Sequence, residues 1–200
     1  MIGLRILLAE DEPAVAASLE QQLRALGHQV VAEATTGSEA VSLSVERRPD
    51  VIVMDIKMPD CDGIEAARQI AEQYPVPVVF LSGHFDEGLL AGVTAAGGLA
   101  YLLKPATSDQ LQAALALARS RFLEMQDLRE QAVRLEQALE VKKLVARAKG
   151  LLMQRQGLSE EEAHRQMQKE ASRSNLKLVD LARAILAAEP LLSVESGDRK

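Results

Sequence analysis

Four short apolar runs in the first half of the chain each end next to a chemically active side chain. RILLA precedes Glu10 and Asp11, VIVM precedes Asp55, PVVFL precedes Ser82 and AYLL precedes Lys104. Short β-branched runs that alternate with longer helical stretches are typical of buried strands in a parallel α/β sheet. Functional groups gather at the carboxyl ends of such strands. The pattern therefore predicts one cleft that holds three carboxylates, a hydroxyl and an ammonium.

Three carboxylates in one cleft repel one another unless something neutralises their charge. Mg²⁺ suits them because it takes hard oxygen ligands from carboxylates and fills its other positions with water and phosphate oxygens. Asp55 could then attack an electrophilic phosphorus and form an aspartyl phosphate. Lys104 and the Ser82 hydroxyl would hold the phosphoryl oxygens. Each acid taken singly is explained by a solvated loop, but that reading fails for the whole set.

These residues resemble the CheY-like receiver domain of two-component response regulators. The strings LLAEDEP, MDIKMPDCDG, FLSG and AYLLKP carry the resemblance, which covers about residues 4–121. The resemblance implies a doubly wound, parallel five-stranded sheet of the flavodoxin-like type. It also implies a sensor histidine kinase as partner. We predict a receiver domain over residues 1–121.

The resemblance assigns roles in the acidic cleft. Asp55 is expected to be the phosphoacceptor and Asp11 a direct Mg²⁺ ligand. Glu10 would act on the metal through water, and the backbone carbonyl of Lys57 would be the remaining protein ligand.

The resemblance also predicts a switch beside the cleft. Ser82 and Lys104 would sense the phosphoryl group, and the Tyr101 ring would turn inward when Ser82 moves. The bond between Lys104 and Pro105 is usually cis in this family.

Composition and charge indicate where the protein is located in the cell and what kind of partner it binds. The single cysteine excludes an intrachain disulfide. No signal-peptide pattern and no apolar run of membrane-spanning length is present, so we expect a cytoplasmic protein with no membrane partner. Residues 142–190 carry ten Lys/Arg against six Asp/Glu, whereas residues 1–122 carry nine against sixteen. A basic module behind an acidic one suggests a polyanion partner for the second half.

After Pro105 the chain reads as one long helix to about Gln156, with Ser108 or Asp109 as its cap. Residues 122–141 are predicted to be a coiled-coil linker, because apolar residues recur there with 3-4-3-4 spacing. The predicted seam consists of Met125, Leu128, Ala132, Leu135 and Leu139. We expect this seam to pair with a second copy, in a homodimer that phosphorylation promotes. The alternative is that it covers the protein's own C-terminal helices.

A small three-helix all-α domain is predicted over residues 142–190, followed by a flexible tail over residues 191–200. Its second and third helices are expected at about 159–173 and 177–188. The signals for these boundaries are Gly157 after the first helix, a Ser159–Glu162 capping box, and Pro190 after the last helix.

This segment resembles the ANTAR domain, the RNA-binding output module of antiterminator regulators of the AmiR/NasT type. The strings ARAKGLLM, GLSEEEAH, MQKEAS and LVDLARAIL carry the resemblance. It implies binding to stem-loops in the leader of a nascent transcript, which prevents a terminator hairpin. The family usually has an aromatic residue where this chain has His164, which is read equally well as a packing residue. The candidate RNA-binding residues are Arg147, Lys149, Arg155, His164, Arg165, Lys169 and Arg173.

The sequence therefore predicts a phosphorylation-dependent response regulator that binds RNA stem-loops and acts in transcription antitermination. The alternative is a receiver whose C-terminal helices serve only for dimerisation or protein docking. A phosphohydrolase of the haloacid-dehalogenase type would carry an Asp-x-Asp motif, but Ile56 and Lys57 follow Asp55. We expect no metabolic enzyme activity beyond slow loss of the phosphoryl group.

Overall fold

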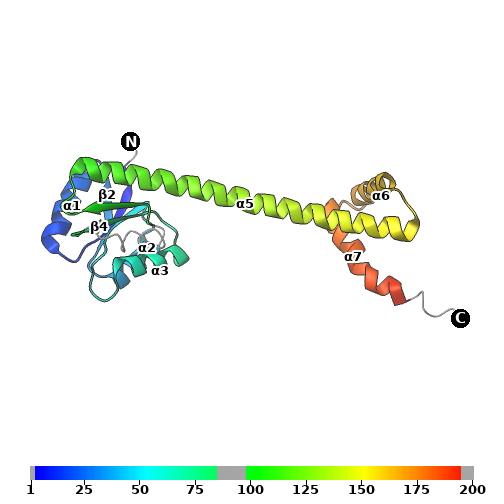
Figure 1. The fold of residues 1–200 in the computed structure, drawn as a ribbon, viewed down its shortest axis with the longest axis horizontal. Helices are drawn as coiled ribbons and strands as arrows, with labels where there is room; N and C mark the ends of the chain where they lie inside the picture. The colour runs from blue at the N-terminus through cyan, green and yellow to red at the C-terminus, as the bar shows by residue number, and fades with distance from the viewer. Residues whose placement is uncertain (1–2, 85–97, 195–200) are drawn as a thin grey trace. The chain divides into compact units, whose positions relative to one another are not determined.

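The computed structural model describes residues 3–84 and 98–194, except for the side chains of residues 189–194. The chain divides into two compact units, Met1–Asp127 and Leu128–Lys200 (Figure 1). One helix, α5 (Ser108–Gln156), contributes residues to both units.

The first unit contains a parallel five-stranded sheet with the strand order β2-β1-β3-β4-β5. Its strands are β1 (Arg5–Ala9), β2 (Gln29–Ala34), β3 (Val51–Asp55), β4 (Val78–Ser82) and β5 (Ala100–Leu103). Every residue of β3 and β4 is buried, because helices cover both faces of the sheet. The predicted doubly wound α/β fold is confirmed.

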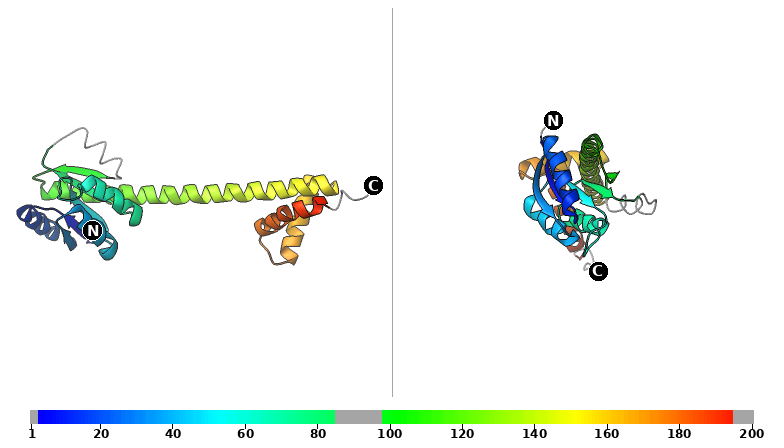
Figure 2. Two further views of the ribbon diagram at one scale, coloured as in Figure 1. Left: turned by 90° about the horizontal axis from the view of Figure 1, so that it is seen from below. Right: turned by 90° about the vertical axis from the view of Figure 1, so that its left-hand side faces the viewer.

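Two helical layers enclose this sheet (Figures 1 and 2). On one face α1 (Pro13–Ala25) and the start of α5 bury Leu23 and Leu115 against the strands. On the other face α2 (Gly37–Arg47) and α3 (Gly63–Gln73) contribute Ala40, Ala67 and Ile70 to a separate core. Small residues on α2 and α3 allow these helices to approach the sheet closely.

The cap at the start of α5 differs from the prediction. The backbone N–H of Gln110 donates to Thr107 Oγ1 at 3.3 Å, and the Thr107 N–H donates to Gln110 Oε1 at 2.9 Å. The predicted cap at Ser108 or Asp109 is wrong. Thr107 and Gln110 stand three residues apart and form a reciprocal capping box, which satisfies two backbone donors at once.

The second unit packs α6 (Glu160–Arg173) and α7 (Leu178–Val194) with the C-terminal part of α5. Ala148, Met167 and Ala182, one from each helix, are fully buried or nearly so. Val145 and Leu152 of α5 pack around them. The predicted small three-helix domain is confirmed.

Most boundary signals of the second unit behave as predicted. Gly157 has φ +68° and its N–H donates to the Met153 carbonyl, which ends α5. Ser159 and Glu162 form the expected capping box. The predicted end of the last helix near residue 188 is wrong, since α7 continues through Pro190 to Val194. A proline removes one helical hydrogen bond, but its φ is compatible with a helix. Of the predicted tail, residues 195–200 lie outside the described residues.

Candidate functional site

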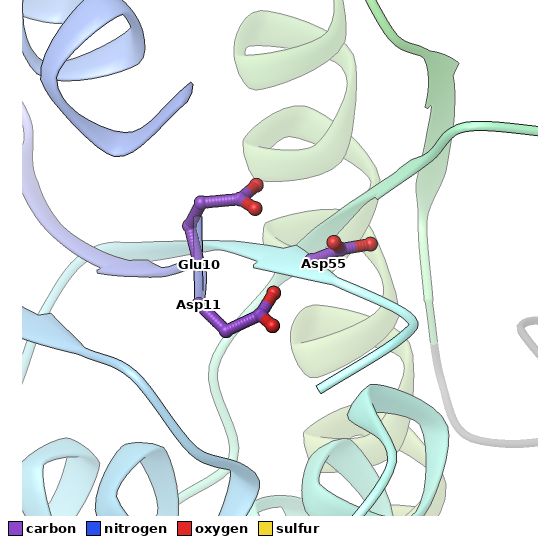
Figure 3. Close-up of side chains that lie close together, drawn as sticks. All are labelled: Glu10, Asp11 and Asp55. Atoms are coloured by element: carbon purple, nitrogen blue, oxygen red, sulfur yellow. The ribbon is translucent and has the colours of Figure 1, made fainter. Parts of the chain in front are cut away.

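Three carboxylates meet at the carboxyl ends of β1 and β3. These strands are neighbours in the sheet, and the strand order reverses between them. Glu10 and Asp11 follow β1, and Asp55 ends β3 (Figure 3). Each residue offers one carboxylate oxygen, and these atoms all lie within 4.8 Å of one another. Open α/β sheets bind ligands at this kind of switch point.

Lys104 bridges two of these acids. Its Nζ lies 2.6 Å from Glu10 Oε2 and 2.6 Å from Asp55 Oδ2. The Glu10 side chain is 0 % exposed, the Asp55 side chain 7 % and the Lys104 side chain 15 %. The Lys104 N–H donates to the Ser82 carbonyl at 2.8 Å, which fixes the lysine at the edge of the sheet. The cis peptide bond between Lys104 and Pro105 is present.

Burial and charge shift the pKa values of two groups in the cluster. Burial raises the pKa of Glu10, and hydrogen bonding to Lys104 offsets this only partly. Burial also disfavours the Lys104 ammonium, but hydrogen bonds to Asp55 and Glu10 outweigh it and raise the pKa of Lys104. Lys104 is therefore a firmly held cation that compensates part of the negative charge.

The loop after β3 holds Asp55 by close backbone packing. The Lys57 N–H donates to Asp55 Oδ1 at 3.2 Å, and the Gly63 N–H donates to the Ile56 carbonyl at 2.8 Å. A Cβ at Gly63 would lie 2.1 Å from the Asp55 carbonyl oxygen. Only glycine permits this approach of α3 to the backbone of Asp55 and Ile56.

The cluster suits a small hard cation. The Asp11 carboxylate is partly exposed and makes no hydrogen bond or ion pair within the described part of the chain. It is thus an acceptor without a donor beside two further carboxylates. Lys104 supplies one positive charge against three acids, so the donor set fits Mg²⁺.

Ser82 and Tyr101 share one hydrogen-bond acceptor. Ser82 Oγ donates to the His84 carbonyl oxygen at 2.9 Å, and the Tyr101 hydroxyl donates to the same oxygen at 2.6 Å. Ser82 is buried, whereas the Tyr101 ring is half-buried against the core. The two predicted switch residues are therefore linked through the His84 backbone, a connection that the sequence did not reveal.

The predicted seam residues of α5 are exposed. Leu128, Leu135 and Leu139 have exposed fractions of 59 %, 71 % and 52 %. The core of the second unit instead uses Val145 and later residues of α5. The structure thus disfavours the alternative that the seam covers the protein's own C-terminal helices.

The candidate RNA-binding residues fall into two groups. Most are exposed cations on α5 and α6: Arg147, Arg155, Arg165, Lys169 and Arg173. Lys149 and His164 are more buried. Lys149 Nζ lies 2.5 Å from Glu160 Oε1, with 18 % of its side chain exposed, so it joins α5 to α6. His164 is half-buried, and its Nδ1 is buried without a hydrogen-bond partner among the residues that the structure describes.

Among the described helices, none combines the length and the apolar character that crossing a membrane requires.

Comparison with known proteins matches both halves of the chain to families. The response regulator receiver domain matches residues 6–116, and the ANTAR domain matches residues 133–186. The transcriptional regulatory protein PdtaR of Mycobacterium tuberculosis is 39 % identical over 182 residues, which cover 91 % of this chain and 89 % of PdtaR. The transcriptional regulatory protein LiaR of Bacillus subtilis is 38 % identical over 117 residues, covering 58 % of this chain and 56 % of LiaR.

Solved structures resemble the receiver part. The response regulator domain of Thermotoga maritima CheB has 28 % identity and a TM-score of 0.55, covering 59 % of this chain and 97 % of that domain. The response regulator PhyR from Brucella abortus has 30 % identity and a TM-score of 0.57, and the match covers 66 % of this chain and 54 % of PhyR. The fold, the acidic cluster and both family matches agree: this chain belongs to the response regulators that join a receiver domain to a C-terminal ANTAR domain.

Proposed function

We propose that this chain is a phosphorylation-controlled RNA-binding regulator that acts in transcription antitermination. The observation that carries the proposal is the buried Glu10–Lys104–Asp55 cluster in a chain that also matches the ANTAR domain. The cluster supplies a phosphoryl acceptor, and the second unit supplies exposed cations for RNA.

The phosphoryl group would come from a phosphohistidine of a sensor kinase. An Asp55 carboxylate oxygen attacks phosphorus, the bond between phosphorus and the imidazole nitrogen breaks, and that nitrogen leaves with the electron pair. Glu10, Asp11, Asp55 and the Lys57 carbonyl would hold Mg²⁺, which would neutralise charge on the transferring group. Lys57, two residues after Asp55, keeps the acceptor oriented through its N–H.

Lys104 would redistribute its hydrogen bonds after transfer. In the unmodified protein its ammonium is shared between Glu10 and Asp55. The new phosphoryl oxygens carry more negative charge than the original carboxylate and would draw the ammonium toward them. The Ser82 hydroxyl would turn to a phosphoryl oxygen and release the His84 carbonyl. Tyr101 would then no longer share that acceptor with Ser82. These movements would transmit phosphorylation of Asp55 to the surface of the first unit.

RNA binding would rest on the cations of the second unit. Arg165, Lys169 and Arg173 recur every four residues along α6 and therefore lie on one side of that helix. All three are exposed, so they are available to phosphates. RNA hairpins offer both phosphates and unpaired loop bases, which is where sequence-specific RNA readout usually occurs.

Homodimerisation would use the exposed seam. A helix whose apolar stripe faces water gains stability by burying that stripe against a partner. Residues 122–141 supply about two heptads, too few for tight association alone. We therefore expect phosphorylation to add a second contact between the receiver units.

The test is binding of the purified protein to a pool of structured leader RNAs and to duplex DNA of matched length. Hairpin-selective binding that weakens at higher salt is expected. No preference for RNA would instead support the alternative, in which the C-terminal helices serve only for dimerisation or docking.

A further inference from the structure

A shallow hollow lies where α6 ends and α7 begins. It has a volume of about 760 Å³. Its apolar lining comes from Ala171, Leu176 and Leu178, and its polar lining from Gln168, Ser172, Asn175 and Lys177. All of these residues belong to the second unit.

The turn that shapes the hollow is defined by the backbone. Asn175 has φ +52°, a left-handed conformation that asparagine tolerates better than most residues. The Leu176 N–H donates to the Ala171 carbonyl at 2.9 Å and closes the turn. Leu176 nevertheless remains 48 % exposed. The geometry therefore keeps an apolar side chain at the surface, beside polar groups.

The polar side chains of this lining have no partner in the part of the chain that the structure describes. Within the described ranges, the side chains of Gln168, Ser172, Asn175 and Lys177 make no hydrogen bond or ion pair. The amides of Gln168 and Asn175 thus offer both hydrogen-bond donors and acceptors to a ligand in the hollow. An apolar lining with a few polar groups is the usual composition of a small-ligand site.

One cation lines the hollow and two follow lining residues in the sequence. Lys177 lines it directly, Lys169 follows Gln168, and Arg173 follows Ser172. Arg173 contacts Glu170 only at 3.6 Å, with both side chains well exposed, so this pair competes weakly with a phosphate.

We propose that this hollow receives one unpaired base of a hairpin loop. The apolar residues would contact the face of the base, and the amides of Gln168 and Asn175 would bond to its edge. Lys177, Lys169 and Arg173 would contact the flanking phosphates. An unpaired base combines an apolar face, a hydrogen-bonding edge and an adjacent phosphate, as this lining requires. This inference rests on the proposed RNA binding and names the part of the surface that reads sequence.

The test is selection from a pool of RNA hairpins that share one stem and carry a randomised loop. The full-length protein, treated with a phosphoryl donor, is compared with its Gln168→Ala and Asn175→Gly variants. The second substitution removes the amide but preserves the left-handed backbone. Gln166→Ala is the matched control, because Gln166 is an exposed amide on α6 outside the hollow.

The wild-type protein and Q166A are expected to enrich the same base at one loop position. Q168A and N175G are expected to bind the fixed stem but to lose discrimination at that position by roughly ten-fold. If the wild type enriches a loop base and both hollow variants enrich it equally well, the base-binding assignment is overturned while RNA binding stands. If the wild type enriches no hairpin at all, the proposed function fails with it.

If the hollow binds a protein partner and not an RNA base, the two variants should behave differently. Both hollow variants would then keep wild-type loop selection but fail to promote terminator read-through in a transcription reaction. That result would also overturn the base-binding assignment.

Discussion

The two units use charged side chains in opposite ways. In the first unit Glu10 and Asp55 are almost fully buried and share one lysine, so their positions follow from the sheet that surrounds them. In the second unit the cations of α6 are exposed and mostly unconstrained. The fold therefore holds the acidic cluster in place, whereas the proposed RNA surface is an electrostatic face whose specificity would have to come from shaped features.

The largest expected effect is the loss of phosphoryl transfer when Asp55, and not a neighbouring acid, is replaced. Asp55→Asn removes the nucleophilic carboxylate and should abolish transfer of a labelled phosphoryl group in the presence of Mg²⁺. Asp60→Asn is the control, because Asp60 is exposed and has φ +74°, which asparagine tolerates. Label that persists at a single site in D55N would show that another residue is the acceptor.

Among substitutions of charged residues, removal of Lys104 should lower the stability of the protein most. Lys104→Ala leaves Glu10 and Asp55 buried without a counter-ion, and we expect a loss of about 3 kcal/mol in the free energy of unfolding. The exposed pair Arg134–Glu130 is the matched control, since R134A should cost no more than about 0.5 kcal/mol.

Urea unfolding with and without Mg²⁺ checks this prediction. Magnesium should stabilise K104A more than the wild type, because the cation then replaces the missing charge. Equal stabilisation of both proteins would argue against a shared role for the lysine and the metal in neutralising these carboxylates.

Two glycines distinguish close packing in the first unit from open space in the second. Gly63→Ala places a methyl group against the Asp55 carbonyl and should cost about 2 kcal/mol of unfolding free energy. Gly150→Ala meets nothing within 4 Å, lies inside α5, and should stabilise the protein by about 0.5 to 1 kcal/mol. Thermal unfolding of both variants measures the contrast, and a neutral G63A would contradict the packing argument.

A charge in the seam should weaken self-association. Leu135→Asp places a carboxylate at a seam position that is 71 % exposed, and we expect dimerisation of the phosphorylated protein to weaken at least about ten-fold. Val133→Asp is the control, because Val133 is 52 % exposed but lies off the seam. Sedimentation equilibrium distinguishes them, and equal loss in both variants would remove the seam from the interface.

The smallest effect concerns a buried histidine of the first unit. Burial lowers the pKa of His28, whose Nδ1 accepts a hydrogen bond from the Leu4 N–H at 3.2 Å. As pH falls below about 6.5, the unfolded histidine takes up a proton before the folded one does, so stability should fall. The H28N variant keeps an acceptor and should lack this pH-dependent loss, as unfolding between pH 7 and pH 5 would show.

The contrast between the two units also explains what could be predicted from sequence. Glu10, Asp55 and Lys104 were found because strand ends in a parallel sheet must meet. The ion pairs of Lys104 were not predicted, because strand ends show only that the groups meet and not which carboxylates the ammonium contacts. Lys149 was predicted as a candidate RNA-binding residue, but it pairs with Glu160 of the next helix. Such contacts depend on how side chains of different helices meet, which periodicity does not specify. The Thr107 cap was readable from Thr-x-x-Gln but was missed.

The most direct test of the account measures whether the receiver controls RNA binding. The affinity of the whole protein for a selected RNA hairpin is determined with and without acetyl phosphate and Mg²⁺, for the wild type and for D55N. We expect phosphorylation to strengthen binding by the wild type and to leave D55N unchanged. A wild-type affinity that is identical in both states, or a D55N protein that responds equally, would contradict the central claim.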